Sequence, residues 1–543
     1  MVTLWSAFTS RERRDIGIYI VGIMCYKFAL EYYNGAFITL ANERFPTSSK
    51  YTKVAMLTGL NAAMQCIGSI LIAPLIKRMP TRTVLSAAVF MFGLISCILL
   101  ICDAATGGKP KMSNGGKTKY GTWNPNGLFP IYIISGIAYG MVELIRRVIP
   151  RDIVGGDVQK LRKMDAIVHV MYEVAGTTGA FTSTSLIGKL GYNYSSIPSP
   201  ILFCTAGIIW RFVSDHRSNA HSAAGLADEP GLSGLEKEDS NKSYMHSIWV
   251  GFRSFGKSFY FGLLLVCSSR KYIWLVPGFV LPGYSFALYG HRYLENGLAP
   301  IFAKQILGSS SWSQIIVGGS NFGELLGALS VLVFSTQIPT PIPWLRLDAV
   351  ALNLVWILPF IKVTKGNVAG AWRVAGCFIP ISYGWAAGDV SLAAYIQSSL
   401  AKIENIDPDV SALGAVMAFL YVTYIVMYAV ISSVLGKWVD KQLVKKVTPQ
   451  EILKRVGGIQ FSILCVIVLL ATLIPRGALS FNPKMVEGAT SVEQEDEEAT
   501  TPTQYGSEQG EKAAMDAEYD VHGHKLDKMS HGNGTDKLAQ SSL

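Results

Sequence analysis

Charged residues and catalytic motifs are scarce in this sequence. Asp, Glu, Lys and Arg make up only 16% of its 543 residues, whereas hydrophobic residues make up 50%, and the mean hydropathy is +0.32. A chain this long and this apolar is typical of a membrane protein, because one soluble core could not enclose its apolar residues. No HExxH metal helix occurs, and we expect no cofactor, no metal site, no nucleotide site and no enzyme activity.

Cysteine is also sparse, and its spacing suggests no pairing. Eight cysteines occur, nearly all within apolar runs, and no two have C-x-x-C spacing, which argues against a zinc site or a disulfide framework. A net charge of +10 can indicate a nucleic-acid partner, but these Lys and Arg residues lie in short segments between apolar runs. Membrane orientation explains that placement better, so no nucleic-acid partner is expected.

Apolar runs of about 20 residues, long enough to cross a bilayer as helices, recur along most of the chain. The sequence predicts an all-α polytopic membrane protein with twelve spans. They are expected near 16–40, 53–76, 84–103, 128–148, 166–188, 199–214, 271–297, 311–335, 345–362, 371–398, 411–436 and 456–475.

Composition and an internal repeat predict four regions. Two six-helix bundles are expected at 1–214 and 271–476, a cytoplasmic linker with an amphipathic segment at 215–270, and a disordered acidic cytoplasmic tail at 477–543. A shift of about 259 residues pairs Gly59, Gln65 and Gly68 with Gly318, Glu324 and Gly327. Such a repeat is expected of two pseudo-symmetric bundles.

Basic residues predict the orientation. If the spans alternate, clusters that include Arg11, Lys77 and Arg151 fall on one side, which predicts that this side and both termini are cytoplasmic. The clusters near Lys109 and Lys437 oppose this topology. The plasma membrane is the expected location, with the vacuolar membrane as an alternative. A sequon between spans five and six makes Asn193 a possible N-glycosylation site.

The segment between spans two and three carries the most specific resemblance to a known family. It reads APLIKRMPTRTVL (73–85), and it is similar to the G-x-x-x-D-R-x-G-R-R-x-x-L pattern of the major facilitator superfamily. Arg78, Arg82 and Leu85 match that pattern, whereas Ala73, Lys77 and Pro80 replace its Gly, Asp and Gly. The resemblance implies a two-bundle transporter in which this turn latches neighbouring helices, so Arg78 and Arg82 are expected to be structural or gating residues.

The first candidate site lies near the middle of span one. Lys27 and Glu31 are four residues apart on one helix face, with Asn34 close by, so they can pair along the helix. Ionisable residues inside a membrane are costly and usually functional, which favours a site for substrate or a proton. The alternative is a self-neutralised pair that only joins span one to its bundle.

The second candidate site is on span five, where His169 and Glu173 also share a helix face. A histidine with a carboxylate partner is a plausible proton-coupling element, biased by Arg146, Arg147 or Glu143 on span four. The alternative is a latch between spans four and five near the cytoplasmic surface.

In the second half, Glu324 lies at the repeat position of Gln65, and Asp389 follows an aromatic and glycine-rich stretch. These residues fit a cavity for a polar or cationic organic molecule, or alternatively glycine-mediated helix packing. Pro277 and Pro282, each followed by Gly, should bend or break span seven, either for gating or as a static kink.

These features predict a secondary transporter of a small organic solute that works by alternating access. The candidate cavity positions combine aromatic residues with few charges, which favours efflux of a drug-like compound or secondary metabolite. Proton coupling is included in this hypothesis as an option. One alternative is a proton-coupled uptake permease for a nutrient or metal chelate. Another is a membrane sensor or scaffold that transports nothing. The expected partners are the small-molecule substrate, the lipid bilayer and protons.

Overall fold

The fold was analysed in a computed structural model that describes residues 8–154, 158–214, 244–268, 279–334, 337–400, 412–475 and 479–480. The described chain is helical apart from its connecting segments. Its first half contains α2 (Ser10–Arg44), α3 (Lys50–Arg78), α4 (Thr81–Ala105), α5 (Leu128–Val154), α6 (Val158–Leu190) and α7 (Pro198–Arg211). A separate helix, α9 (Tyr244–Ser268), follows. Most of the predicted linker and almost all of the predicted tail lie outside the described residues.

The second half begins with a helical stretch made of η6 (Pro282–Phe286), α10 (Ala287–Tyr293), η7 (Leu294–Leu298), α11 (Ala299–Phe302) and η8 (Ala303–Leu307). It continues with α12 (Ser313–Phe334), α13 (Ile342–Ala351), η10 (Leu352–Ile357), α14 (Ala369–Leu400) and α15 (Ala412–Val444). It ends with α16 (Pro449–Leu453), η11 (Lys454–Ile459) and α17 (Gln460–Ala471). Each of the twelve predicted spans overlaps at least one of these helical elements.

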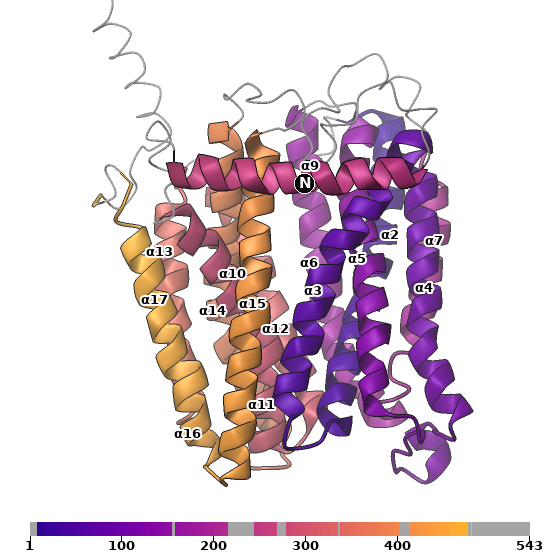
Figure 1. Ribbon diagram of the computed structural model, residues 1–543, viewed down its shortest axis with the longest axis vertical. Helices are drawn as coiled ribbons and strands as arrows, with labels where there is room; N and C mark the ends of the chain where they lie inside the picture. Colours follow the sequence, from indigo (N-terminus) through magenta and orange to yellow (C-terminus); the bar gives the residue numbers. More distant parts are fainter. Residues whose placement is uncertain are drawn as a thin grey trace, which may run out of the picture. The chain divides into compact units, whose positions relative to one another are not determined.

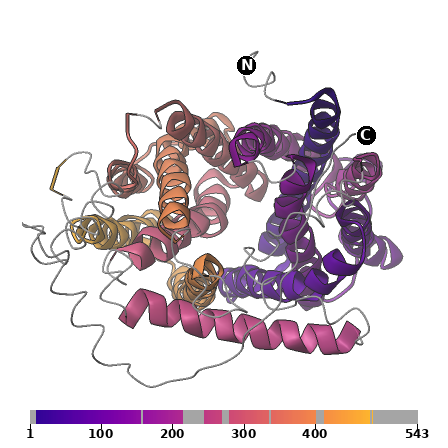
Figure 2. The same cartoon turned by 90° about the horizontal axis from the view of Figure 1, so that it is seen from above.

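The helices form two groups, each with its own apolar core. One core consists of residues between Phe8 and Val213, and a second draws almost entirely on residues from Leu288 onward. Seen from above, the two groups lie side by side, and α9 runs along both of them (Figure 2). Figure 1 shows α9 crossing one end of the helices, which we call the α9 end, and α16 at the opposite end, which we call the α16 end.

Seven of the described helical segments are long and apolar enough to cross a membrane. They correspond to α2, α3, α4, α5, α12, α15 and the stretch from α16 to α17. The other predicted spans are too short or too polar to qualify by themselves: α7 has 14 residues, whereas α6 has 33 residues but carries ionisable groups. Helices that face a polar cavity are expected to be less apolar than those that face lipid.

The predicted repeat corresponds to equivalent helix crossings in the two groups. Gly68 of α3 meets the backbone carbonyl of Ile137 on α5, and Gly327 of α12 meets the carbonyl of Tyr383 on α14. A side chain at either glycine would collide with the neighbouring backbone. Small residues at such crossings let helix backbones approach closely in membranes, which explains why both halves keep glycine there.

The helix is not broken at Pro282, so of the two predicted effects only a bend stays a prediction there. Pro282 is the first residue of the π-helical turn η6, and α10 follows without interruption. The wider turn absorbs the missing N–H of proline and its ring, so the helix continues through this position. Pro277 lies outside the described residues.

The helix α9 packs one side against the protein, where Leu265 and Val266 are buried, and leaves other large apolar residues exposed. A side chain at Gly262 would collide with the backbone of Ala415 on α15, and one at Gly251 would press on Ile70 of α3. The exposed side includes Met245, Trp249 and Tyr260, which are 57–71% exposed. This pattern is typical of a helix that lies in a membrane interface.

The same helix contains a sequence match that was not expected. Residues 251–258 read GFRSFGKS, which fits the GxxxxGKS pattern of phosphate-binding loops. A phosphate loop needs an irregular glycine-rich segment between a strand and a helix, whereas these residues lie inside α9. The match therefore identifies no nucleotide site.

Asn193 is packed inside the α16 end. Its side-chain nitrogen, the atom to which a glycan would be attached, donates hydrogen bonds to Asp103 Oδ2 at 2.6 Å and to the carbonyl oxygen of Lys119 at 2.9 Å. The residue is completely buried. A glycan on this nitrogen would remove this packing, and the modification stays a prediction.

Candidate functional site

A cavity of about 590 Å³ lies between the two helix groups. Its walls come from α2, α3, α5 and α6 of the first half and from α10, α12, α14 and α15 of the second. All the predicted substrate and coupling candidates line it, namely Lys27, Glu31, Asn34, Gln65, His169, Glu173, Glu324 and Asp389. Residues that are far apart in the sequence therefore share one space.

The cavity is more acidic than basic. Its lining includes six carboxylates, those of Glu31, Glu143, Glu173, Glu295, Glu324 and Asp389. The same lining includes three permanently basic side chains, those of Lys27, Arg146 and Arg292. Charged groups at this depth need partners or a polar cavity, and their pairing decides which of them remain available to a ligand.

In the first half, two ion pairs lie next to one aromatic ring. Lys27 Nζ is 2.6 Å from Glu31 Oε1, and Arg146 Nη2 is 2.6 Å from Glu143 Oε2. The Lys27 ammonium and the Arg146 guanidinium are 4.7 and 4.6 Å from the centroid of the Tyr172 ring. Cation–π contacts of this kind are stronger where water is excluded, so Tyr172, which sequence reasoning did not single out, connects α2, α5 and α6.

Removing one member of the Lys27–Glu31 pair should destabilise the protein more than removing both charges. Lys27→Met leaves the Glu31 carboxylate without its cation, and breaking a buried pair costs about 3–5 kcal/mol. The double substitution Lys27→Met with Glu31→Gln should recover much of that loss. Thermal unfolding of the detergent-solubilised proteins measures both effects. A double variant as unstable as Lys27→Met would show that the pair is not coupled.

The predicted pairing of His169 with Glu173 is not present. Neither residue has a hydrogen bond or ion pair with the other among the described residues, and Glu173 Oε2 is buried without a hydrogen-bond partner there. Glu173 is only 4% exposed and faces the cavity. The side chain of Arg147 lies outside the described residues, so its predicted influence on this site stays a prediction.

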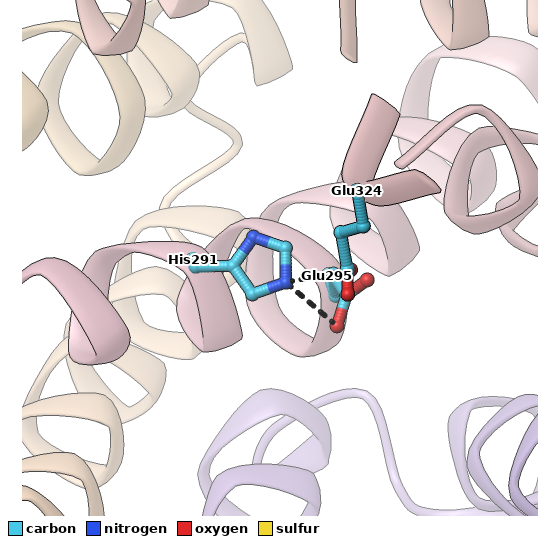
Figure 3. Close-up of side chains that lie close together, drawn as sticks. All are labelled: His291, Glu295 and Glu324. Atoms are coloured by element: carbon cyan, nitrogen blue, oxygen red, sulfur yellow. Dashed lines mark ion pairs between the residues drawn. The ribbon is translucent and has the colours of Figure 1, made fainter. Parts of the chain in front are cut away.

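In the second half, three side chains form a compact cluster (Figure 3). His291 Nε2 is 3.0 Å from Glu324 Oε1 and 3.6 Å from Glu295 Oε2. The His291 ring stacks on the indole of Trp385, with 3.8 Å between centroids and 5° between planes. Arg292 Nη1 lies 3.3 Å from Glu295 Oε2. Sequence reasoning did not predict the approach of His291 and Glu295 to α12 or the stacking of His291 on α14.

The cavity is closed at the α16 end by polar contacts between the two halves. Asp440 of α15 accepts hydrogen bonds from the Tyr51 and Thr52 backbone nitrogens at 3.0 and 2.9 Å and from Thr52 Oγ1 at 2.7 Å. Lys304 Nζ lies 2.7 Å from Glu43 Oε1. Toward the α9 end the lining consists of residues such as Ile70, Pro74 and Phe255. No residue of this closure was predicted from the sequence.

Residues 73–85, which are similar to the family pattern, lie at the α9 end, and only some of their side chains are described. Arg82 Nη1 donates a hydrogen bond to the carbonyl oxygen of Val213 at 2.8 Å, which ties the start of α4 to the end of α7. The side chain of Arg78 lies outside the described residues. The latching role of Arg82 is therefore supported by a contact, and that of Arg78 stays a prediction.

No protein-family model matches the sequence, and no curated protein matches it. Several solved structures share its architecture. The D-xylose–proton symporter superposes with a TM-score of 0.55 at 12% identity, covering 87% of this chain and 98% of that one. The fold is that of the major facilitator superfamily.

Two further structures with this fold differ in what they bind. The Escherichia coli xylose transporter XylE, in a partially occluded inward-open conformation, gives a TM-score of 0.52 at 13% identity, covering 86% of this chain and 97% of that one. A POT family transporter in complex with a thioalcohol-conjugated peptide gives 0.55 at 11% identity, covering 86% and 97%. Such distant likeness shows the fold, and the predicted two-bundle membrane architecture is confirmed.

Proposed function

We propose that this protein is a proton-coupled secondary transporter of a small polar organic solute. The observation that carries the proposal is the central cavity, which both halves build and which is closed at the α16 end. A cavity at the interface of two repeats, with ion pairs that can open and close, is suited to alternating access. The sugar, nucleoside and peptide transporters with this fold support the same general activity.

The charges in the cavity favour proton coupling and a polar cargo. The efflux hypothesis assumed few charges around the aromatic residues, whereas six carboxylates line the space. Of these, Glu173 has a buried oxygen without a hydrogen-bond partner among the described residues. A carboxylate in this position can take up a proton when the cavity closes around it. The direction of transport, efflux or uptake, stays a prediction, as do the host membrane and the cytoplasmic placement of the termini.

Transport by the purified protein tests the proposal. Proteoliposomes would be incubated with a broad panel of polar metabolites and drug-like compounds, with and without an imposed pH gradient. We expect at least one polar compound to accumulate only when the gradient is present. If a compound exchanges across the membrane in counterflow but does not accumulate, proton coupling is wrong and only transport remains of the proposal. If no compound moves, and removal of the tail after residue 485 abolishes a cellular signal, the sensor alternative replaces the proposal.

A further inference from the structure

The His291, Glu295 and Glu324 side chains converge in the wall of the cavity, and this cluster goes beyond the transport proposed above. One nitrogen and two carboxylate oxygens lie within 4.8 Å of one another. They come from two separate stretches, the helix α10 with its extension η7 and the helix α12. Figure 3 shows the imidazole nitrogen directed at the carboxylates of both glutamates. We infer that these three residues form a binding site for a divalent transition-metal ion.

The spacing of the three atoms is compatible with a shared metal ion. Around a tetrahedral zinc ion with bonds of roughly 2.0–2.2 Å, neighbouring ligand atoms are separated by about 3.4 Å. His291 Nε2 is 3.0 and 3.6 Å from the two carboxylate oxygens. The two separations therefore bracket the tetrahedral value.

The histidine is buried between the indole of Trp385 and the two carboxylates. His291 is 1% exposed, and neither of its ring nitrogens has a hydrogen-bond partner of good geometry in the described part of the chain. Stacking on Trp385 fixes the ring so that Nε2 faces the carboxylates. A buried imidazole held in this way, with one ring nitrogen directed at two carboxylate oxygens, becomes a metal ligand when the ion replaces the proton on that nitrogen.

The charge balance and the access route are also suitable. The two glutamates supply two negative charges, and Arg292 partly offsets one of them through Glu295 Oε2. Glu324 and Glu295 both line the cavity, so an ion can reach the cluster from it, and a water molecule or a substrate group can complete the coordination. One imidazole and two carboxylates favour Zn²⁺, Co²⁺ or Mn²⁺, whereas Mg²⁺ and Ca²⁺ prefer oxygen ligands alone.

Metal binding by the full-length protein in nanodiscs tests the inference. Isothermal titration with Zn²⁺ should show one saturable site per chain, and Co²⁺ should give the visible absorption bands of a tetrahedral complex. A large excess of Mg²⁺ should leave both signals unchanged. His291→Gln and Glu324→Gln should each weaken Zn²⁺ binding by more than about tenfold. Comparable thermal unfolding with and without each substitution shows that the variants remain folded.

Two matched variants exclude binding by other residues. His246→Gln removes an exposed histidine of α9, and Glu451→Gln removes a partly exposed glutamate that pairs with Lys454. Neither should change the Zn²⁺ isotherm. The inference is overturned if the wild-type protein shows no saturable site, if Mg²⁺ competes as well as Zn²⁺ does, or if His291→Gln binds as the wild type does. Because no step measures transport, failure here is separate from failure of the proposed function.

Discussion

The Glu173→Gln protein should still carry substrate down its own gradient but should no longer concentrate it. Glu173 lies on α6 in the cavity wall, is 4% exposed, and has one carboxylate oxygen without a hydrogen-bond partner in the described structure. Glutamine keeps the shape and polarity of the side chain but cannot take up and release a proton. If this carboxylate couples the proton gradient to transport, the substitution separates binding from accumulation.

The expected effect is large because the gradient is the only energy source that the proposal allows. For one coupled proton, each unit of pH difference supports about a tenfold accumulation, equivalent to roughly 1.4 kcal/mol. In Glu173→Gln proteoliposomes the inside-to-outside ratio should fall to near one at any imposed gradient. Counterflow of labelled substrate, measured without a gradient, should remain within a few-fold of the wild type.

A matched control separates this effect from a general loss of charge. Glu12→Gln removes a carboxylate that pairs with Lys160 at 2.8 Å, outside the cavity lining, and accumulation should be preserved in that variant. If Glu173→Gln concentrates the substrate as well as the wild type does, proton coupling through this residue is wrong. Another cavity carboxylate, such as Glu324 or Asp389, would then have to be tested.

The parts of the site that the sequence predicts are those whose signal is local. Lys27 and Glu31 could be paired from their spacing along one helix, and an ionisable residue in an apolar run is visible without a structure. Gln65 and Glu324 could be related through the repeat. All of these residues line the cavity, because a two-bundle fold directs the polar faces of its spans inward.

The parts that were missed depend on contacts between distant segments. His291 meets Glu324 across 33 positions of sequence and stacks on Trp385 from a third helix, and no periodicity in one helix indicates such a meeting. A short motif is informative only where its structural setting is present. The GxxxxGKS match lies inside the helix α9, and the Asn193 sequon is buried against Asp103, so neither has the setting that its motif requires.

The closure at the α16 end was unpredictable for the same reason. Its chemistry shows how the two halves are held together there. The first turn of α3 has Ser49 at its N-cap, but the Ser49 side chain makes no capping hydrogen bond. Asp440, which is 389 positions from Tyr51, accepts from the Tyr51 and Thr52 nitrogens instead. A helix N-terminus needs acceptors and favours negative charge, so α3 is capped by the opposite half.

Because this cap exists only while the halves are in contact, Asp440→Ala should open the α16 end. Hydrogen bonds to a charged group contribute about 1.5–3 kcal/mol each. Allowing for solvation of the freed groups, we expect a net shift of about 3 kcal/mol, which changes the ratio of closed to open states by a factor of about 100. Spin labels at Thr47 and Lys445, in a cysteine-free background, measure the separation of the two halves.

The distance distribution of Asp440→Ala should gain a longer component that the parent protein lacks. Thr52→Val removes only one of the three hydrogen bonds to Asp440 and should produce a much smaller shift of about 1 kcal/mol. This graded response is specific to a cap shared between halves, since a merely destabilised helix would broaden the distribution in both variants equally. An unchanged distribution in Asp440→Ala would assign the closure to the Glu43–Lys304 ion pair and the apolar packing around it.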